Sequence, residues 1–133
     1  MDFTQQVIDK LTLFVQKKTF TVECKPGWNY VFIVFENNQE KFSMQQSFGG
    51  GYHWVHIMIP NEDKISVSDS SLSIGLYTQT KSLYKTLCDT YEKQELVEKE
   101  KNEQKLKEAH QAYLSAEHKK QTQILNKLDA YLK

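Results

Sequence analysis

The stretch between residues 28 and 59 constrains the fold most, because it holds both tryptophans and the densest run of β-forming side chains. Two turn signals divide it, the pair Asn37-Asn38 and the three glycines 49–51. Side chains alternate between two faces along a strand. Two segments are apolar on both faces, which is typical of central strands covered on both sides, and the segment between them alternates as a half-exposed strand does. These segments are residues 28–36, 52–59 and 40–46.

An amphipathic helix is expected before this stretch, over residues 2–17. Asp2 suits its N-cap, and Gln5 follows at the spacing of a capping box. Residues 19–24 then alternate as a strand, with Phe20, Val22 and Cys24 facing inward. After Pro60, two weaker alternations predict edge strands, Ile65 with Val67 and then Leu72 with Ile74 and Leu76.

The chain beyond about residue 80 contains no glycine or proline, and its apolar residues follow helical spacing. A polar run at 98–105 leaves two arrangements open, one continuous helix or a helical hairpin that turns near Lys101-Asn102. A second apolar stripe follows, and the small sheet offers little room for it, so we expect it to pack against another copy of the chain. The residues expected to carry this self-association are Leu106, Tyr113, Ile124, Leu128 and Tyr131.

The fold class expected is α+β, with an N-terminal helix, an antiparallel sheet of about five strands and a long C-terminal helix or helical hairpin. A chain of 133 residues is long enough for one modest core. Residues 1–77 are expected to form the helix-and-sheet domain, and residues 78–133 the helical segment for self-association.

Composition narrows the classes of partner. The formal net charge is zero, and all 17 basic residues are lysine. Lysine lacks the planar fork with which arginine recognises phosphate and guanine, so nucleic-acid binding is disfavoured. The abundance of Lys, Gln, Asn and Tyr is typical of an AT-rich genome, such as that of a bacterium or its phage.

Localisation is expected to be cytoplasmic. The first ten residues lack the basic start and apolar core of a signal peptide, and no run reaches the length of a membrane span. Cys24 and Cys88 are scattered, which favours reduced packing thiols over a disulfide.

One pair of residues offers a catalytic alternative. Glu23 and Lys25 have the Glu-x-Lys spacing of restriction-endonuclease-type nucleases, in which the carboxylate binds Mg²⁺ and the lysine orients water. That site also needs an acid on a preceding strand, whereas only a helix, with Asp9 in it, precedes this one. The plainer interpretation is an outward-facing solvated pair.

The histidines and glycines do not favour a metal or cofactor, and none is expected. His53 and His56 are three apart in a strand and point to opposite faces, while His110 and His118 are eight apart on a helix. The three glycines are not followed by a helix that could hold phosphate, so a hairpin connection or a mobile binding loop is expected.

An aromatic set is the strongest candidate for a binding surface. Such a set can be core beneath the C-terminal helix, the anchor of a protein interface, or a platform that stacks single-stranded bases. Its members, with the hairpin glycine beside them, are Trp28, Tyr30, Tyr52, Trp54, His56 and Gly50. The function expected is a small non-enzymatic binding protein, an adaptor or inhibitor of the kind that mobile elements encode. Single-stranded nucleic-acid binding and the Mg²⁺-dependent nuclease remain the alternatives.

Overall fold

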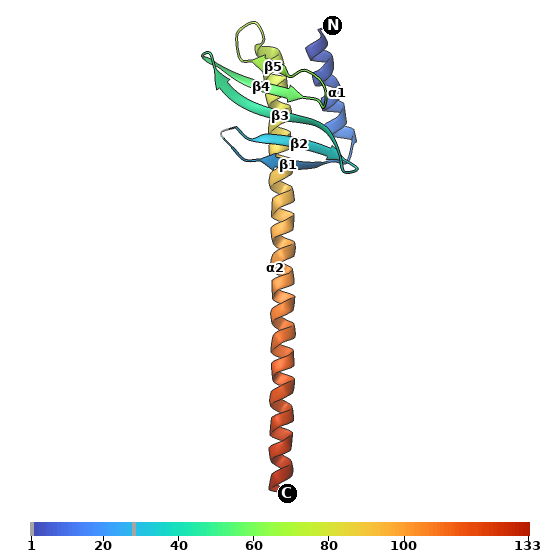
Figure 1. Ribbon diagram of the computed structural model, residues 1–133, viewed down its shortest axis with the longest axis vertical. Coiled ribbons are helices and arrows are strands. Elements are labelled where there is room, and N and C mark those ends of the chain that lie inside the picture. The colour runs from blue at the N-terminus through green and yellow to red at the C-terminus, as the bar shows by residue number, and fades with distance from the viewer. Residues whose placement is uncertain (1, 28) are drawn as a thin grey trace. The chain divides into compact units, whose positions relative to one another are not determined.

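The computed structural model describes residues 2–27 and 29–133 and resolves two units, Met1–Gln94 and Glu95–Lys133. The fold is α+β, as predicted from the sequence (Figure 1). The elements in chain order are α1 (Phe3–Lys17), β1 (Thr21–Lys25), β2 (Val31–Glu36), β3 (Gln39–Gly49), β4 (Tyr52–Met58), β5 (Ile65–Ser68) and α2 (Ile74–Leu132). The helix α2 starts near the expected boundary after residue 77, and its beginning belongs to the same unit as the sheet.

The five strands form one antiparallel sheet in which each strand pairs with its neighbours in sequence, in the order β1-β2-β3-β4-β5. Two tight hairpins sit at the predicted turns. Asn37 and Asn38 have φ values of 54° and 62°, and Gly50 and Gly51 have 60° and 83°. Two successive residues with positive φ give the turn whose twist matches paired strands, and Asn and Gly tolerate it best. Both hairpin predictions are confirmed.

Both helices of the first unit pack on the same face of the sheet. Phe14 of α1 meets Phe42 edge-on at 5.8 Å between ring centroids, and Tyr84 of α2 meets Phe32 in the same way at 5.3 Å. The buried core lies between these layers and consists of Ile8, Val22, Phe32, Val34, Phe42, Met44, Val55, Ile57, Val67, Tyr77, Leu83, Tyr84 and Leu87. The expectation of helices over both faces of the central strands is therefore wrong.

The first helix has the predicted N-cap, whereas Gln5, predicted to complete a capping box, bonds to Asp9 and Gln79 instead. The carboxylate of Asp2 accepts a hydrogen bond from the Thr4 amide at 3.4 Å, which caps the helix N-terminus. The side-chain amide of Gln5 donates to Asp9 at 2.8 Å and to Gln79 of α2 at 2.7 Å. Gln5 therefore joins the two helices at the polar edge of their contact.

The edge strand predicted over residues 72–76 is wrong. The side chain of Leu72 is 99% exposed, and α2 starts at Ile74. The carbonyl of Ser73 accepts the first helical hydrogen bond, from the Tyr77 amide at 2.9 Å, and its hydroxyl bonds to Ser70 at 3.0 Å. An alternation of five residues fits the start of a helix as well as a strand, and the serine cluster decides for the helix.

The hairpin alternative for the C-terminal segment is also wrong, because α2 is one helix of 59 residues and is helical at Lys101 and Asn102. Within residues 2–27 and 29–133, no helix has the length and apolar content that crossing a bilayer requires.

The outer edge of β1 is closed by a side chain of α2. The Val22 amide donates to Gln94 Oε1 at 2.8 Å, and Gln94 Nε2 donates back to the Val22 carbonyl at 2.9 Å. The glutamine amide thus mimics one residue of a neighbouring strand. An unpaired edge is a template for pairing with other chains, and this contact blocks it at the second residue of β1.

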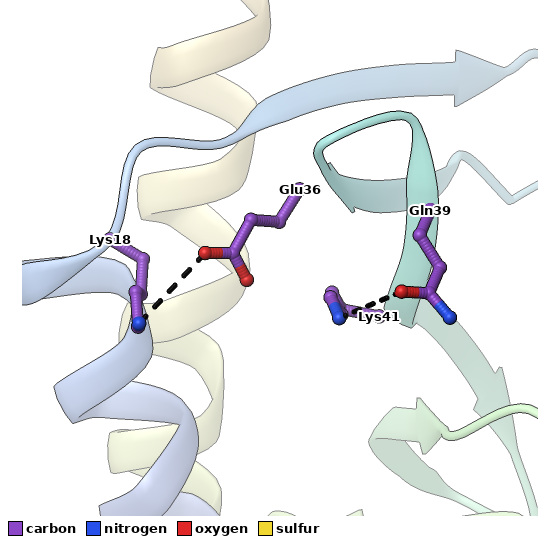
Figure 2. Close-up of polar contacts among 4 residues, drawn as sticks. All are labelled: Lys18, Glu36, Gln39 and Lys41. Atoms are coloured by element: carbon purple, nitrogen blue, oxygen red, sulfur yellow. Dashed lines mark hydrogen bonds and ion pairs between the residues drawn. The ribbon is translucent and has the colours of Figure 1, made fainter.

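Figure 2 shows polar contacts beside the first hairpin. Lys18, just after α1, lies 4.0 Å from the carboxylate of Glu36, and Lys41 donates to Gln39 at 3.2 Å. The side chain of Lys18 is 58% exposed, so this ion pair contributes little to stability.

Candidate functional site

The sheet face turned away from both helices is the first candidate surface, and we call it the open face. The strand register places alternate residues of each strand on it, opposite the core residues. Its apolar and aromatic members are Val31, Ile33, Phe35, Tyr52, Trp54, His56 and Met58, and its small polar members include Ser43, Gln45, Ser47, Ser66 and Ser68.

His56 is the centre of a hydrogen-bonded cluster on the open face. Its Nε2 lies 2.6 Å from the Ser47 hydroxyl and its Nδ1 lies 2.7 Å from the Ser66 hydroxyl. In a neutral ring, one nitrogen donates to one serine and the other accepts from the second serine. The side chain is 8% exposed, so these two serines fix both the position and the orientation of the ring.

Trp54 lies beside this cluster and extends it along β4. Its ring is parallel to that of His56, with centroids 6.4 Å apart and an interplanar angle of 6°. The indole N–H donates to the carbonyl of Gly49 at 3.0 Å, across the glycine hairpin. The indole is therefore held flat against its neighbour, with Tyr52 following on the same face at the end of the strand. A fixed aromatic row of this kind is suited to contact with another flat or apolar surface.

The environment of His56 favours its neutral form. Burial lowers its pKa below the ordinary value, and the positive charge of Lys64 lowers it further. The unfolded chain keeps the ordinary value near 6.5, so between the two values the unfolded state binds more protons than the folded state. The contribution of neutral His56 to stability is therefore complete above about pH 6.5 and is lost as the pH falls through the folded pKa.

We therefore predict that the free energy of unfolding decreases between pH 7.5 and pH 5.5, and that His56→Gln removes part of this decrease. Glutamine keeps hydrogen-bonding capacity toward the serines but does not titrate. Urea unfolding of both chains at the two pH values measures the effect. Equal losses in the wild type and in His56→Gln would show that another group is responsible.

The predicted aromatic set divides between the two faces. Tyr52, Trp54 and His56 share the open face, and Gly50 lies in the adjoining hairpin. Tyr30 lines a cavity with Lys81 and Tyr84 of α2 instead, and its backbone carbonyl accepts a hydrogen bond from the Tyr84 hydroxyl at 3.2 Å. The prediction that all these aromatic residues share one face is therefore wrong for Tyr30. The helix α2 packs on the other face of the sheet from Tyr52, Trp54 and His56. Trp28 lies outside the described residues.

The Glu23 and Lys25 pair lies on the edge strand β1 of the sheet. Both side chains are exposed on β1, and the residue opposite Glu23 on β2 is Ile33. Across the part of the chain that the structure describes, no three histidine, cysteine, aspartate or glutamate side chains converge where they could hold a metal ion. His53 and His56 lie on opposite faces as predicted, with His53 against the Phe48 ring at 4.8 Å.

Two adjoining cavities lie between α2 and the far end of β3. Their volumes are about 340 and 610 Å³, and both are lined by Gln46, Lys81 and Tyr84. Lys81 also sits 5.8 Å above the ring of Tyr77. This side of the molecule combines cationic and aromatic groups. No local sequence pattern indicates this cavity region, because Gln46 and Lys81 are separated by more than thirty positions along the chain.

The second candidate surface is on the Glu95–Lys133 unit, every residue of which the structure describes. All of its residues except Glu117 are exposed. At 100° per residue, eight large apolar side chains fall within an arc of about 120° on one side of the helix. We call them the C-terminal stripe, and they are Leu106, Tyr113, Leu114, Ile124, Leu125, Leu128, Tyr131 and Leu132.

The stripe contains the five residues predicted for self-association, and each is between 51% and 80% exposed. Leu114, Leu125 and Leu132 were missed by the sequence analysis. Each directly follows one of the predicted residues in the sequence. A helical projection places all three along the same border of the stripe.

Comparison with known proteins identifies no relative. No protein-family model, no curated protein and no solved structure matches this chain.

Proposed function

We propose that this chain is a non-enzymatic binding protein that self-associates through the C-terminal stripe and uses the open face to contact a protein partner. The observation that carries the proposal is the exposure of eight large apolar side chains on one side of a single helix. Apolar patches of this extent usually mark interaction sites on proteins. A helix within a globular fold instead buries such a stripe against its own core, as α1 does here.

A binding role fits the open face better than catalysis does. The contact between Ser47 and His56 has the spacing of a nucleophile and its base. The second ring nitrogen, however, meets the neutral hydroxyl of Ser66 rather than a carboxylate. Burial and Lys64 also oppose the protonated ring that a general base must become. The cluster therefore serves to hold Trp54 and its neighbours in place.

The finer form of the proposal is a cytoplasmic adaptor or inhibitor encoded by a bacterium or phage. Cys24 and Cys88 are free thiols, which is the usual state in a reducing compartment. Burial raises the pKa of both, that of Cys88 to about 11, and this protects them from reaction at neutral pH.

Single-stranded nucleic-acid binding is the second candidate, and the aromatic row of Tyr52, Trp54 and His56 favours it. Such binding also needs a track of positive charge along the same surface, and on this face β1 places Glu23 beside Lys25. Quenching of tryptophan fluorescence by oligonucleotides, weakening as salt is added, would move this candidate ahead of a protein partner.

The mass of the purified chain in solution tests the first part of the proposal. Light scattering is expected to give an oligomer, with the dimer of 31 kDa as its smallest form, because each chain has a mass of 15.6 kDa. Dilution should shift the mass toward that of the single chain. A constant mass of one chain, up to concentrations of about 1 mM, would overturn self-association.

A further inference from the structure

We infer that two copies of the C-terminal helix pair antiparallel, centred between His118 and Lys119, and that Glu117 and Lys120 select this orientation. The inference rests on the proposed self-association and adds to it the direction and register of the pairing. The spacing of the stripe and the charges within it support this arrangement.

The spacing of the central stripe residues is the same in both directions. Leu106 and Tyr113 are seven positions apart, and so are Ile124 and Tyr131. A two-fold axis through the point between residues 118 and 119 therefore places Leu106 against Tyr131 of a second copy. In such a pairing each contact occurs twice, because residue i meets residue j and j meets i.

The same axis matches the next large side chains. Tyr113 lies opposite Ile124 of the second copy, and the flanking Leu114 and Leu125 fall on one side at neighbouring heights. Leu106 and Ile124 are 18 positions apart, which is five turns of a straight helix, so these two side chains share one direction. The stripe can thus be covered along its whole length without bending the helix.

The middle of the stripe is polar, and its charges distinguish the two orientations. On the helical projection Glu117 lies near the centre of the stripe and Lys120 at its border. The antiparallel pairing sets Glu117 against Lys120 of the second copy, twice. A parallel pairing in register sets glutamate against glutamate and lysine against lysine, and like charges in contact are destabilising.

A spin label at position 107 tests the orientation on the whole chain. Lys107→Cys is made in a Cys24→Ser/Cys88→Ser background, whose helix content and mass are checked against the wild type. At 1.5 Å per residue, antiparallel pairing about this centre separates the two labels by roughly 35 Å along the axis. Parallel pairing leaves no axial separation, so a dipolar distance below about 20 Å would overturn the inference.

Charge reversal provides a second measurement that does not depend on labels. Glu117→Lys is expected to raise the dimer dissociation constant about tenfold or more, and Glu117→Lys/Lys120→Glu should restore it. A parallel dimer would show no rescue, because each reversed charge would again meet its own copy.

The two proposals fail in different ways. A wild-type chain that stays monomeric in light scattering overturns self-association itself. A dimer with a short label distance, or without rescue in the double variant, overturns the antiparallel arrangement and leaves self-association intact.

Discussion

Tyr113→Lys/Ile124→Lys is expected to convert the self-associated chain to a monomer, with a dissociation constant raised at least about 1000-fold, or about 4 kcal/mol. Each large apolar side chain contributes about 1.5–3 kcal/mol when fully buried, and the variant removes two from each copy. It also places lysine charges in the contact, where they would lose water without gaining partners. Analytical ultracentrifugation over a dilution series measures the change.

The matched control adds the same charge on the opposite side of the same helix. Ser115 and Asn126 each lie two positions beyond a substituted stripe residue, which turns them to the far side of the projection. Ser115→Lys/Asn126→Lys should keep the wild-type dissociation constant within about threefold, since exposed substitutions have small effects. Equal weakening by both variants would show that net charge, rather than the stripe, controls association.

The fold and the association surface occupy different units, and this separation gives the stripe variants their diagnostic value. The buried core between the sheet and the two helices lies within Met1–Gln94. The C-terminal stripe lies within Glu95–Lys133. Stripe variants should therefore leave the tryptophan fluorescence of the folded sheet unchanged. A variant in the core should change the tryptophan fluorescence and leave self-association unchanged.

Much of the fold followed from local patterns. The alternation around Phe42 and Met44, and the turns at Asn37-Asn38 and Gly50-Gly51, predicted hairpins that the structure contains. Successive antiparallel strands joined by tight turns leave little freedom in topology, which is why the sheet order could be predicted. The long run without glycine or proline likewise predicted the helix.

The failures occurred where two arrangements give the same local pattern. Leu72, Ile74 and Leu76 alternate as a strand does, but a helix that begins at Ile74 also accommodates them. Strands that are apolar on both sides did not reveal which side the helices would cover. Ile33, for example, lies on the open face and is only 7% exposed, because neighbouring side chains of the sheet surround it. The placement of Tyr30 depended on that same choice.

The candidate site was less predictable than the fold. Its central contacts join Ser47, His56 and Ser66, which lie nine and ten positions apart on three strands. Serines in alternating strands are common, so the sequence pattern alone did not distinguish these two from solvated ones. The register of the strands brings them to one histidine, and register is a tertiary property.

Leu87→Ala is expected to lower the free energy of unfolding by about 2–5 kcal/mol, the second large effect. Leu87 is fully buried and faces the sheet from α2, in the same cluster as Phe32 and Tyr84. Truncation removes its burial energy and leaves a cavity that the rigid sheet cannot fill. Domains of this size are stable by about 5–15 kcal/mol, so this is a large part of the total.

Urea unfolding followed by tryptophan fluorescence, at one fixed chain concentration, should show a lower midpoint with an unchanged slope. Lys85→Ala, an exposed change on the same turn of α2, should stay within about 0.5 kcal/mol of the wild type. Below its unfolding midpoint, Leu87→Ala should still self-associate with the wild-type mass, because it leaves the C-terminal stripe intact. A monomeric but folded Leu87→Ala would contradict the assignment of association to the stripe, since it would place the contact between copies on the first unit.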